Sequence, residues 1–232
     1  MLLQSDLQSD DFKIRMRSAV SFAWQTLSKK IGHEFVKINK EASLQLQYAV
    51  LLNQLIPLIQ FSNQESYEVE LEHSVQLLDT HREIDVLFVG KKCNCSVQRN
   101  NAVQCKCDVF KIAIEMKCYR EFTTSGNRRG ASDIFMKDVY FDWHLLESYI
   151  EQGKVNQGVA LVMNELENFV NPSNKDAKCW DYDISNDSKI TPKKLTTPIG
   201  GKEIQFELKK QYSIDWKQVK KFWFLEVEGR IL

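Results

Sequence analysis

The chain has 232 residues, of which 43% are hydrophobic and 11% aromatic, and its 31 basic residues balance its 31 acidic ones. This composition excludes an intrinsically disordered protein and suits one compact domain, residues 1–232, with a large core. The charge balance excludes an overall positive field, so a polyanionic partner would have to meet a local basic surface.

The amino terminus, "MLLQSDLQSD", lacks the basic start and apolar stretch of a secretory signal. No uninterrupted apolar run reaches the length of about 18 residues that a membrane span needs. We therefore expect a cytoplasmic protein with no membrane partner, in which cysteines are thiols or metal ligands rather than disulfides.

Two amphipathic helices are predicted before the first strand. Residues 10–30 place apolar side chains at three- and four-residue spacings, which is typical of a helix that ends near Gly32. Residues 41–56 repeat this pattern, and Pro57 is expected to stop the second helix.

Three strand-like segments follow the helices, at residues 67–75, 83–90 and 109–119. Residues 132–153 then predict a helix, with Ser132 or Asp133 at its start and Gly153 at its end. Residues 159–164 are an apolar strand, expected to be buried on both faces and to pair in parallel with the strand before the helix. This order predicts an α/β fold.

The carboxy-terminal part is less regular. Residues 170–201 contain many Asn, Asp, Ser, Pro and Gly residues and are read as a long loop. Residues 202–228 are read as a closing pair of strands. Together they form a predicted carboxy-terminal β addition to the domain.

Residues 83–117 are read as one hairpin whose tip lies at Asn100 and Asn101, because asparagine tolerates the backbone angles of tight turns. A register symmetric about Asn100 places Asp85 opposite Glu115, with Lys117 on the same face. The same register places Cys93 opposite Cys107 and Cys95 opposite Cys105. The other face is predicted to be core and carries Ile84, Val86, Phe88, Phe110, Ile112, Ile114 and Met116.

Asp85 and Glu115 form a candidate metal site in this register. Two adjacent carboxylates repel each other unless a cation joins them, and Mg²⁺ or Mn²⁺ accepts one or two carboxylates while keeping several waters. Lys117 could then hold a phosphate oxygen or an attacking water, which is the chemistry of phosphodiester hydrolysis. The alternative is a solvated strand face with a cross-strand ion pair, but an aspartate in an apolar strand is costly unless it is paired.

Asp85 in "REIDVLF", then Glu115, Met116 and Lys117 in "IAIEMKC", after a helix that opens with Glu41, resembles the PD-(D/E)XK nuclease superfamily, the restriction-endonuclease-like fold. The resemblance covers about residues 34–165. It implies an αβββαβ core with a mixed central sheet flanked by helices, to which the helix 10–30, a cysteine-bearing hairpin tip 91–108 and the segment 170–232 are added. Ile84 stands where the family's name-giving pattern has proline.

The resemblance implies a metal-dependent DNA endonuclease, most like a type II restriction enzyme, that acts on double-stranded DNA as a homodimer. Asp85 and Glu115 would hold Mg²⁺ or Mn²⁺, with the Met116 carbonyl contributing. Lys117 would orient or deprotonate the nucleophilic water, and Glu41 would support the site. The alternatives are a DNA repair or recombination nuclease of the same fold and a non-catalytic DNA-binding or scaffold protein.

Cys93, Cys95, Cys105 and Cys107 could supply four thiolates to a structural Zn²⁺ that ties the hairpin tip. The alternatives are four reduced, packed thiols and, least expected in the cytoplasm, cross-strand disulfides. A metal assay on protein purified without chelator tests the zinc site, because absence of stoichiometric zinc would exclude it.

The loop "YREFTTSGNRRGASD" is a candidate DNA contact. Its arginines, Arg120, Arg128 and Arg129, could each form two hydrogen bonds to backbone phosphates, and the alternative is an ordinary solvated loop. Asp138 and Asp142, on the helix beside Lys137, are expected to form surface ion pairs.

Overall fold

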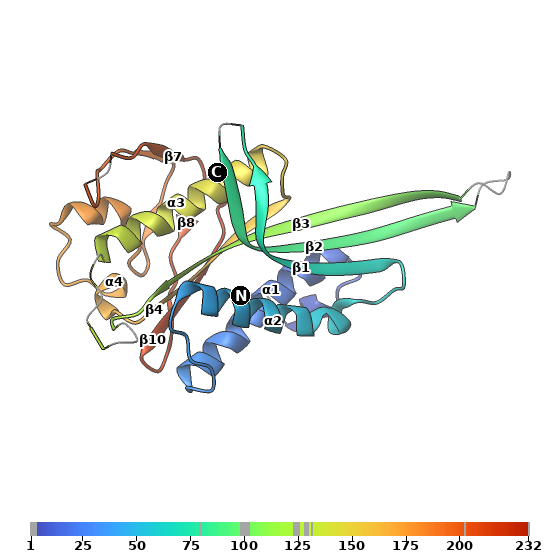
Figure 1. Ribbon diagram of the computed structural model, residues 1–232, viewed down its shortest axis with the longest axis horizontal. Helices are drawn as coiled ribbons and strands as arrows, with labels where there is room; N and C mark the ends of the chain where they lie inside the picture. The colour runs from blue at the N-terminus through green and yellow to red at the C-terminus, as the bar shows by residue number, and fades with distance from the viewer. Residues whose placement is uncertain are drawn as a thin grey trace.

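The computed structural model describes residues 4–78, 80–97, 103–122, 126–127, 130, 132–201 and 203–231. Its centre is a six-stranded mixed sheet with helices on both faces (Figure 1). In spatial order the strands are β1 (Glu65–Gln76), β2 (His81–Val97), β3 (Val103–Tyr119), β4 (Gln157–Asn164), β10 (Phe222–Val227) and β9 (Lys217–Val219). Only the β3–β4 pair of this sheet is parallel, which confirms the predicted crossover and the α/β class.

Three long helices cover the sheet. The helices α1 (Phe12–Gly32) and α2 (Glu41–Ile59) lie on one face, and α3 (Ser132–Glu151) lies on the other. The predicted stop at Pro57 is wrong, because α2 continues to Ile59. A proline in the last helical turn removes only one hydrogen bond there, and the fully buried Ile59 anchors that turn.

The hairpin register is confirmed where the strands pair. The paired residues include Cys93 with Cys107, Cys95 with Cys105 and Val86 with Ile114. Beyond the region that α1 and α2 cover, β2 and β3 continue as a two-stranded arm (Figure 1). Asn100 and Asn101, the predicted tip, lie outside the described residues.

Both faces of the hairpin are core, so the prediction of a single buried face is wrong. Val86, Ile112 and Ile114 pack under α1 and α2, while Leu87 and Ala113 pack under α3. An α/β sheet with helices on both faces buries both sets of side chains. Any polar group on the α3 side of β3 is therefore buried unless it lies near the edge of α3.

Ile84 departs from the predicted face, because it belongs to the cluster under α3. The pairing of β2 with β3 ends at Val86, and the pairing of β1 with β2 omits Asp85 and Glu72. Glu72 has a positive φ of 50°, which bends β1 at the same level. Figure 1 shows β1 and β2 turning away from β3 together.

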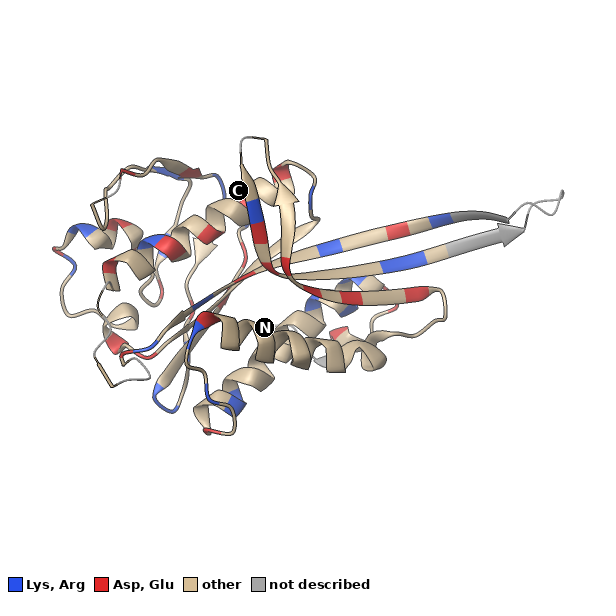
Figure 2. Cartoon of the chain, viewed as in Figure 1, with Lys and Arg blue, Asp and Glu red and all other residues tan. Residues whose placement is uncertain are grey.

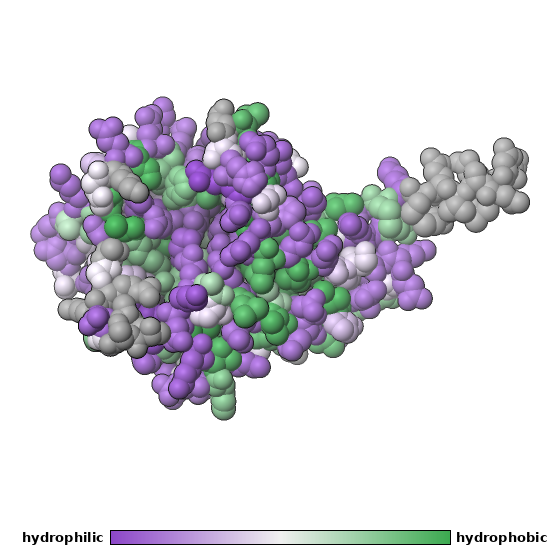
Figure 3. All heavy atoms as spheres, viewed as in Figure 1, coloured by the Kyte–Doolittle hydropathy of each residue, from purple (hydrophilic) through white to green (hydrophobic). Residues whose placement is uncertain are grey.

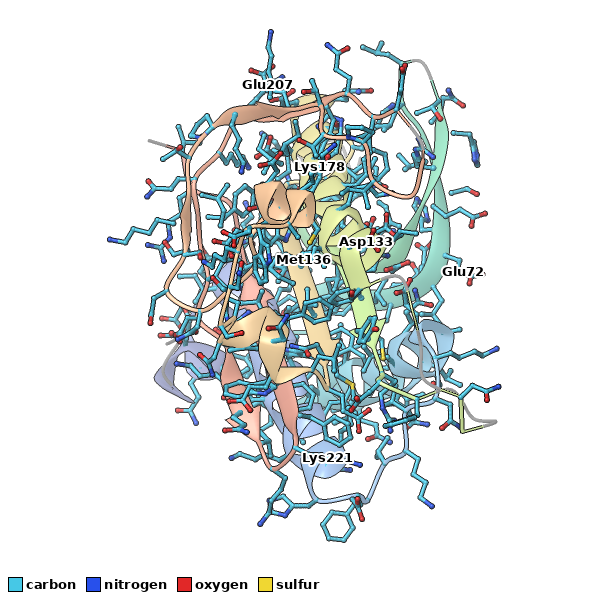
Figure 4. The ribbon with its side chains drawn as sticks, turned by 90° about the vertical axis from the view of Figure 1, so that its left-hand side faces the viewer. Glu72, Asp133, Met136, Lys178, Glu207 and Lys221 are labelled. Atoms are coloured by element: carbon cyan, nitrogen blue, oxygen red, sulfur yellow. A yellow bond between two sulfur atoms is a disulfide. The ribbon has the colours of Figure 1, made fainter. Side chains whose placement is uncertain are left out.

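The carboxy-terminal prediction is wrong in its pairing. Within 170–201 lie the turn η2 (Lys178–Tyr182) and the short strands β5 (Lys189–Ile190) and β6 (Lys193–Leu195), and within 202–228 lie β7 (Phe206–Leu208), β8 (Tyr212–Ser213), β9 and β10. The strand β10 joins the central sheet beside β4, whereas β7 pairs with β6 and β8 with β5. Apolar burial along β10 suits that interior position. Figure 4 shows η2, marked by Lys178, lying over α3.

Beyond its first residue α2 carries no charged residue, and Leu46, Val50 and Leu58 are exposed on its outer face. By length and composition α2 is the one described helix that could cross a membrane, and 39% of its apolar 18-residue stretch is buried in the structure. It nevertheless packs on α1 and the sheet through Leu44, Tyr48 and Leu52, as a core helix does. Hydrophobic side chains gather on this side of the molecule (Figure 3), and Figure 2 shows acidic and basic residues interspersed along the long strands. Cytoplasmic location stays a prediction.

Candidate active site

Asp85 meets β3 at the point where β2 leaves the ladder. Once β2 turns away, the Met116 amide has no strand partner on that side, and its N–H donates to Asp85 Oδ2 at 2.6 Å. The predicted pairing of Asp85 with Glu115 is not part of the ladder, which ends at Val86 and Ile114, and Asp85 instead reaches the residue that follows Glu115. The role predicted for the Met116 carbonyl stays a prediction, since the contact to Asp85 is made by the amide.

Glu115 is a buried carboxylate, with only 4% of its surface exposed. Burial raises the pKa of Glu115 well above its usual range, and the nearby carboxylates of Asp85 and Asp142 raise it further, against the opposing effect of Lys117. Among the described residues its Oε1 atom makes no hydrogen bond of good geometry, although the Tyr149 hydroxyl lies near enough to lower the pKa of Glu115. A buried oxygen of this kind costs free energy until a proton or a cation binds it.

Lys117 lies between two carboxylates. Its Nζ atom is 3.1 Å from Glu41 Oε1 and 3.1 Å from Asp142 Oδ2. Burial lowers the pKa of Lys117, but four carboxylates, led by Asp142 and Glu41, together raise it by more, so the net pKa is raised. The ammonium therefore keeps its proton at neutral pH, which favours an orienting role over the deprotonation of water.

Glu41 comes to the site from a different element. It is the first residue of α2, where the helix dipole favours a negative charge. Its side chain is 36% exposed. Burial raises the pKa of Glu41, Lys117 lowers it and Asp85 raises it again, and the net direction is upward. The predicted support of the site from this helix is thus a direct ion pair with Lys117.

Asp142 is a site residue that the sequence prediction missed. The expected ion pair on the surface is made by Lys137 and Asp138 (2.9 Å), whereas Asp142 is buried and pairs with Lys117. Burial raises the pKa of Asp142 to about 7, with Lys117 lowering it and Asp85 raising it. One signal could have found it: Asp142 interrupts the buried stripe of α3 formed by Phe135, Val139, Leu146 and Tyr149.

Small residues, four positions along the strand from Lys117, let α3 approach the sheet. Ala113 of β3 pairs with Gly158 of β4, directly beneath α3. A Cβ atom added at Gly158 would lie 3.0 Å from the Leu146 side chain, so the helix could not come as close over a larger residue. This approach carries Asp142, one turn before Leu146, to the ammonium of Lys117.

The site holds more negative than positive charge. Four carboxylates, those of Glu41, Asp85, Glu115 and Asp142, act electrostatically on the one ammonium of Lys117. Low-dielectric surroundings strengthen the repulsion between the carboxylates. The described residues contain no group of three or more His, Cys, Asp or Glu side chains arranged to hold a metal. Asp85 and Glu115 nevertheless fit Mg²⁺ or Mn²⁺, which takes one or two carboxylates and completes its shell with waters and phosphate oxygens.

An open cavity of about 370 Å³ adjoins Lys117 and Glu41. Its wall is completed by the first turns of α3 and by the end of β3, with Cys118, Tyr119, Gly130, Ile134, Phe135 and Asp138. The ammonium therefore lines a space that is open to solvent, together with the carboxylates of Glu41 and Asp138.

The hairpin cysteines are only partly described. Cys93 and Cys107 form a disulfide, the arrangement that the sequence made least expected. The side chains of Cys95 and Cys105 lie outside the described residues. A four-thiolate zinc site would require Cys93 and Cys107 in their reduced form, so zinc at the hairpin tip stays a prediction.

Arg120 has structural contacts. Its Nε donates to Glu165 at 2.7 Å, its Nη1 donates to the Ile38 carbonyl, and its guanidinium lies 5.2 Å from the Phe222 ring centre. These contacts tie the end of β3 to the segments around it and give no support to a phosphate contact by Arg120. Arg128 and Arg129 lie outside the described residues.

Replacing Asp142 by Asn should change how stability depends on pH. In the unfolded chain Asp142 ionises near 3.8, whereas in the folded protein its pKa is about 7. Between these values the folded state binds more protons, so Asp142 makes stability fall as pH rises from about 4 to 7, by roughly 4 kcal/mol at most.

Urea unfolding in EDTA should therefore give a free-energy difference, wild type minus Asp142→Asn, that becomes more negative across this window and is flat above it. Glu151→Gln is the matched control, because Glu151 lies on the same helix and pairs with Lys209 on the surface. A difference for Asp142→Asn that does not change with pH would contradict this assignment.

Comparisons with known proteins found no relative of this chain. No family model matches the chain. No curated protein and no solved structure matches it either. The case for a function therefore depends on the geometry and electrostatics of the described residues and on the motif resemblance in the sequence.

Proposed function

We propose that the protein is a metal-dependent endonuclease that hydrolyses DNA phosphodiester bonds, of the type II restriction kind. The observation that carries the proposal is the buried Glu115 carboxylate near Asp85 and a charged Lys117, with an oxygen that makes no well-formed hydrogen bond among the described residues. The order α2, β1, β2, β3, α3, β4 supports the proposed restriction-endonuclease-like core, because it reproduces the αβββαβ pattern expected from the motif.

In this proposal each residue has a separate task. Asp85 and Glu115 hold a divalent cation, and their combined charge is what the cation neutralises. Mg²⁺, when bound, would polarise a phosphate oxygen and lower the pKa of a bound water. Lys117 keeps its proton and stabilises the negative charge that builds up on the phosphate during attack. Glu41 and Asp142 each form an ion pair with the ammonium of Lys117.

Plasmid cleavage tests this proposal. Purified protein should nick or cut supercoiled plasmid with Mg²⁺ or Mn²⁺ and should leave it intact with EDTA. Lys117→Met should slow cleavage by about a hundredfold or more, because it removes the charge that stabilises the transition state. Agarose-gel time courses measure both effects.

Lys209→Met provides the control, since Lys209 is an exposed lysine paired with Glu151 away from the site. Discrete fragments would support restriction, and faster cutting of branched or single-stranded DNA would favour a repair nuclease. Intact plasmid under all conditions, or equal rates for wild type and Lys117→Met, would contradict the proposal and favour a scaffold protein.

We also propose that the enzyme cuts both strands as a homodimer formed through α2. The exposed face of this helix carries Leu46, Val50 and Leu58, followed by Phe61. No charged residue occurs between Glu41 and Glu65. In a twofold interface each surface meets its own copy, so a charge-free apolar stripe can pair with itself without like-charge repulsion.

Val50→Lys should convert the dimer into a monomer, because the twofold axis would bring two buried ammonium groups close together. Light scattering coupled to size-exclusion chromatography measures the mass. Leu78→Lys serves as the control, since Leu78 is 84% exposed and lies in the β1–β2 connection away from α2. A monomeric wild type, or a Val50→Lys variant that keeps the dimer mass, would rule out this interface.

A further inference from the structure

We infer that Asp142 is the residue that positions Lys117, so that α3 sets where the ammonium stands relative to the metal ligands. The effect on catalysis rests on the proposed function, whereas the pairing of Asp142 with Lys117 does not. Neither the motif nor its spacing points to this residue, because Asp142 lies on a helix that follows the motif in the chain.

The two partners of the ammonium differ in their surroundings. Glu41 and Asp142 both lie 3.1 Å from Nζ, but the Glu41 side chain is 36% exposed and the Asp142 side chain is 10% exposed. Glu41 also lines the open cavity, whereas Asp142 does not. An incoming phosphate can therefore compete with Glu41, while the buried pair with Asp142 is shielded from solvent and substrate.

Asp142 is held on a rigid element. Its neighbours on the buried stripe, Val139 and Leu146, are 1% and 5% exposed, and Trp143 next to it is fully buried. The Tyr140 hydroxyl of the same helix donates to the Asp183 carbonyl at 2.8 Å. The close contact of Leu146 with the backbone at Gly158 fixes the height of α3 above the sheet. A carboxylate on such a platform can fix a flexible lysine side chain, which otherwise samples many rotamers.

Loss of Asp142 should therefore affect the rate of DNA cleavage more than the binding of DNA. Lys117 retains its charge without Asp142, since Glu41 remains nearby, but its Nζ atom is no longer confined to one place. A catalytic group that is displaced by about 1 Å can lose on the order of a hundredfold in rate. DNA binding through other surfaces does not depend on this confinement.

A double-mutant cycle tests the inference, with kcat and KM for plasmid cleavage measured for wild type, Asp142→Asn, Lys117→Met and the double variant. Asp142→Asn should lower kcat by about a hundredfold with little change in KM. In the Lys117→Met background the same change should have no further effect, because Asp142 acts through Lys117. Asp142→Glu should restore part of the rate, and Glu151→Gln should match wild type.

The same four proteins are also unfolded in urea at pH 8 in EDTA, which measures the coupling between the two side chains without any catalysis. Non-additive unfolding free energies support the pairing, and additive ones overturn it. If wild type cuts DNA and Lys117→Met does not, but Asp142→Asn keeps the wild-type kcat, the positioning role is wrong and the proposed function stands. If wild type does not cut, the proposed function fails, and the unfolding cycle alone decides whether Asp142 holds Lys117.

Discussion

The site depends on one buried ion pair, that between the Lys117 ammonium and the Asp142 carboxylate. Without the ammonium, four carboxylates would face one another at the edge of a core, and their repulsion in a low dielectric would oppose folding. With it, the negative charge is only partly balanced, as the raised pKa values of Glu115 and Asp142 indicate. The arrangement therefore favours a bound proton or a bound cation.

Three separate features of the fold bring these groups together. The strand β2 leaves β3 at Asp85, which turns the aspartate onto the Met116 amide. The helix α2 begins at Glu41, and α3 approaches β4 closely over Gly158. Each is a local event, but the site exists only because all three place a carboxylate near Lys117.

Much of the framework could be predicted from the sequence, because it depends on local periodicity and on strand register. The cysteine pairs symmetric about Asn100 gave the register of the hairpin, and the apolar run in β4 indicated a parallel, doubly covered strand. Asp85, Glu115 and Lys117 followed from the register, and Glu41 from the motif. These four residues could be predicted because each belongs either to the hairpin or to the sequence motif.

The remainder depends on contacts between distant segments. In the sequence, Asp142 stands near Lys137, which favours an ordinary surface ion pair. Only the packing of α3 over Gly158 shows that Asp142 is the partner of Lys117. Arg120 is identified as structural only once Glu165, forty-five residues later, lies against it. The strand β10 pairs with β9, its neighbour in sequence, and also with the distant β4, because its burial on both faces suits the sheet interior.

Calorimetric titration of Mg²⁺ and Mn²⁺ into the protein at pH 8 tests the central claim most directly. Wild type should take up divalent metal, and Glu115→Gln, which keeps the size of the side chain and removes its charge, should lose that uptake. Glu151→Gln should bind metal as wild type does. Absence of uptake by wild type, or equal uptake by Glu115→Gln, would contradict the account of this site.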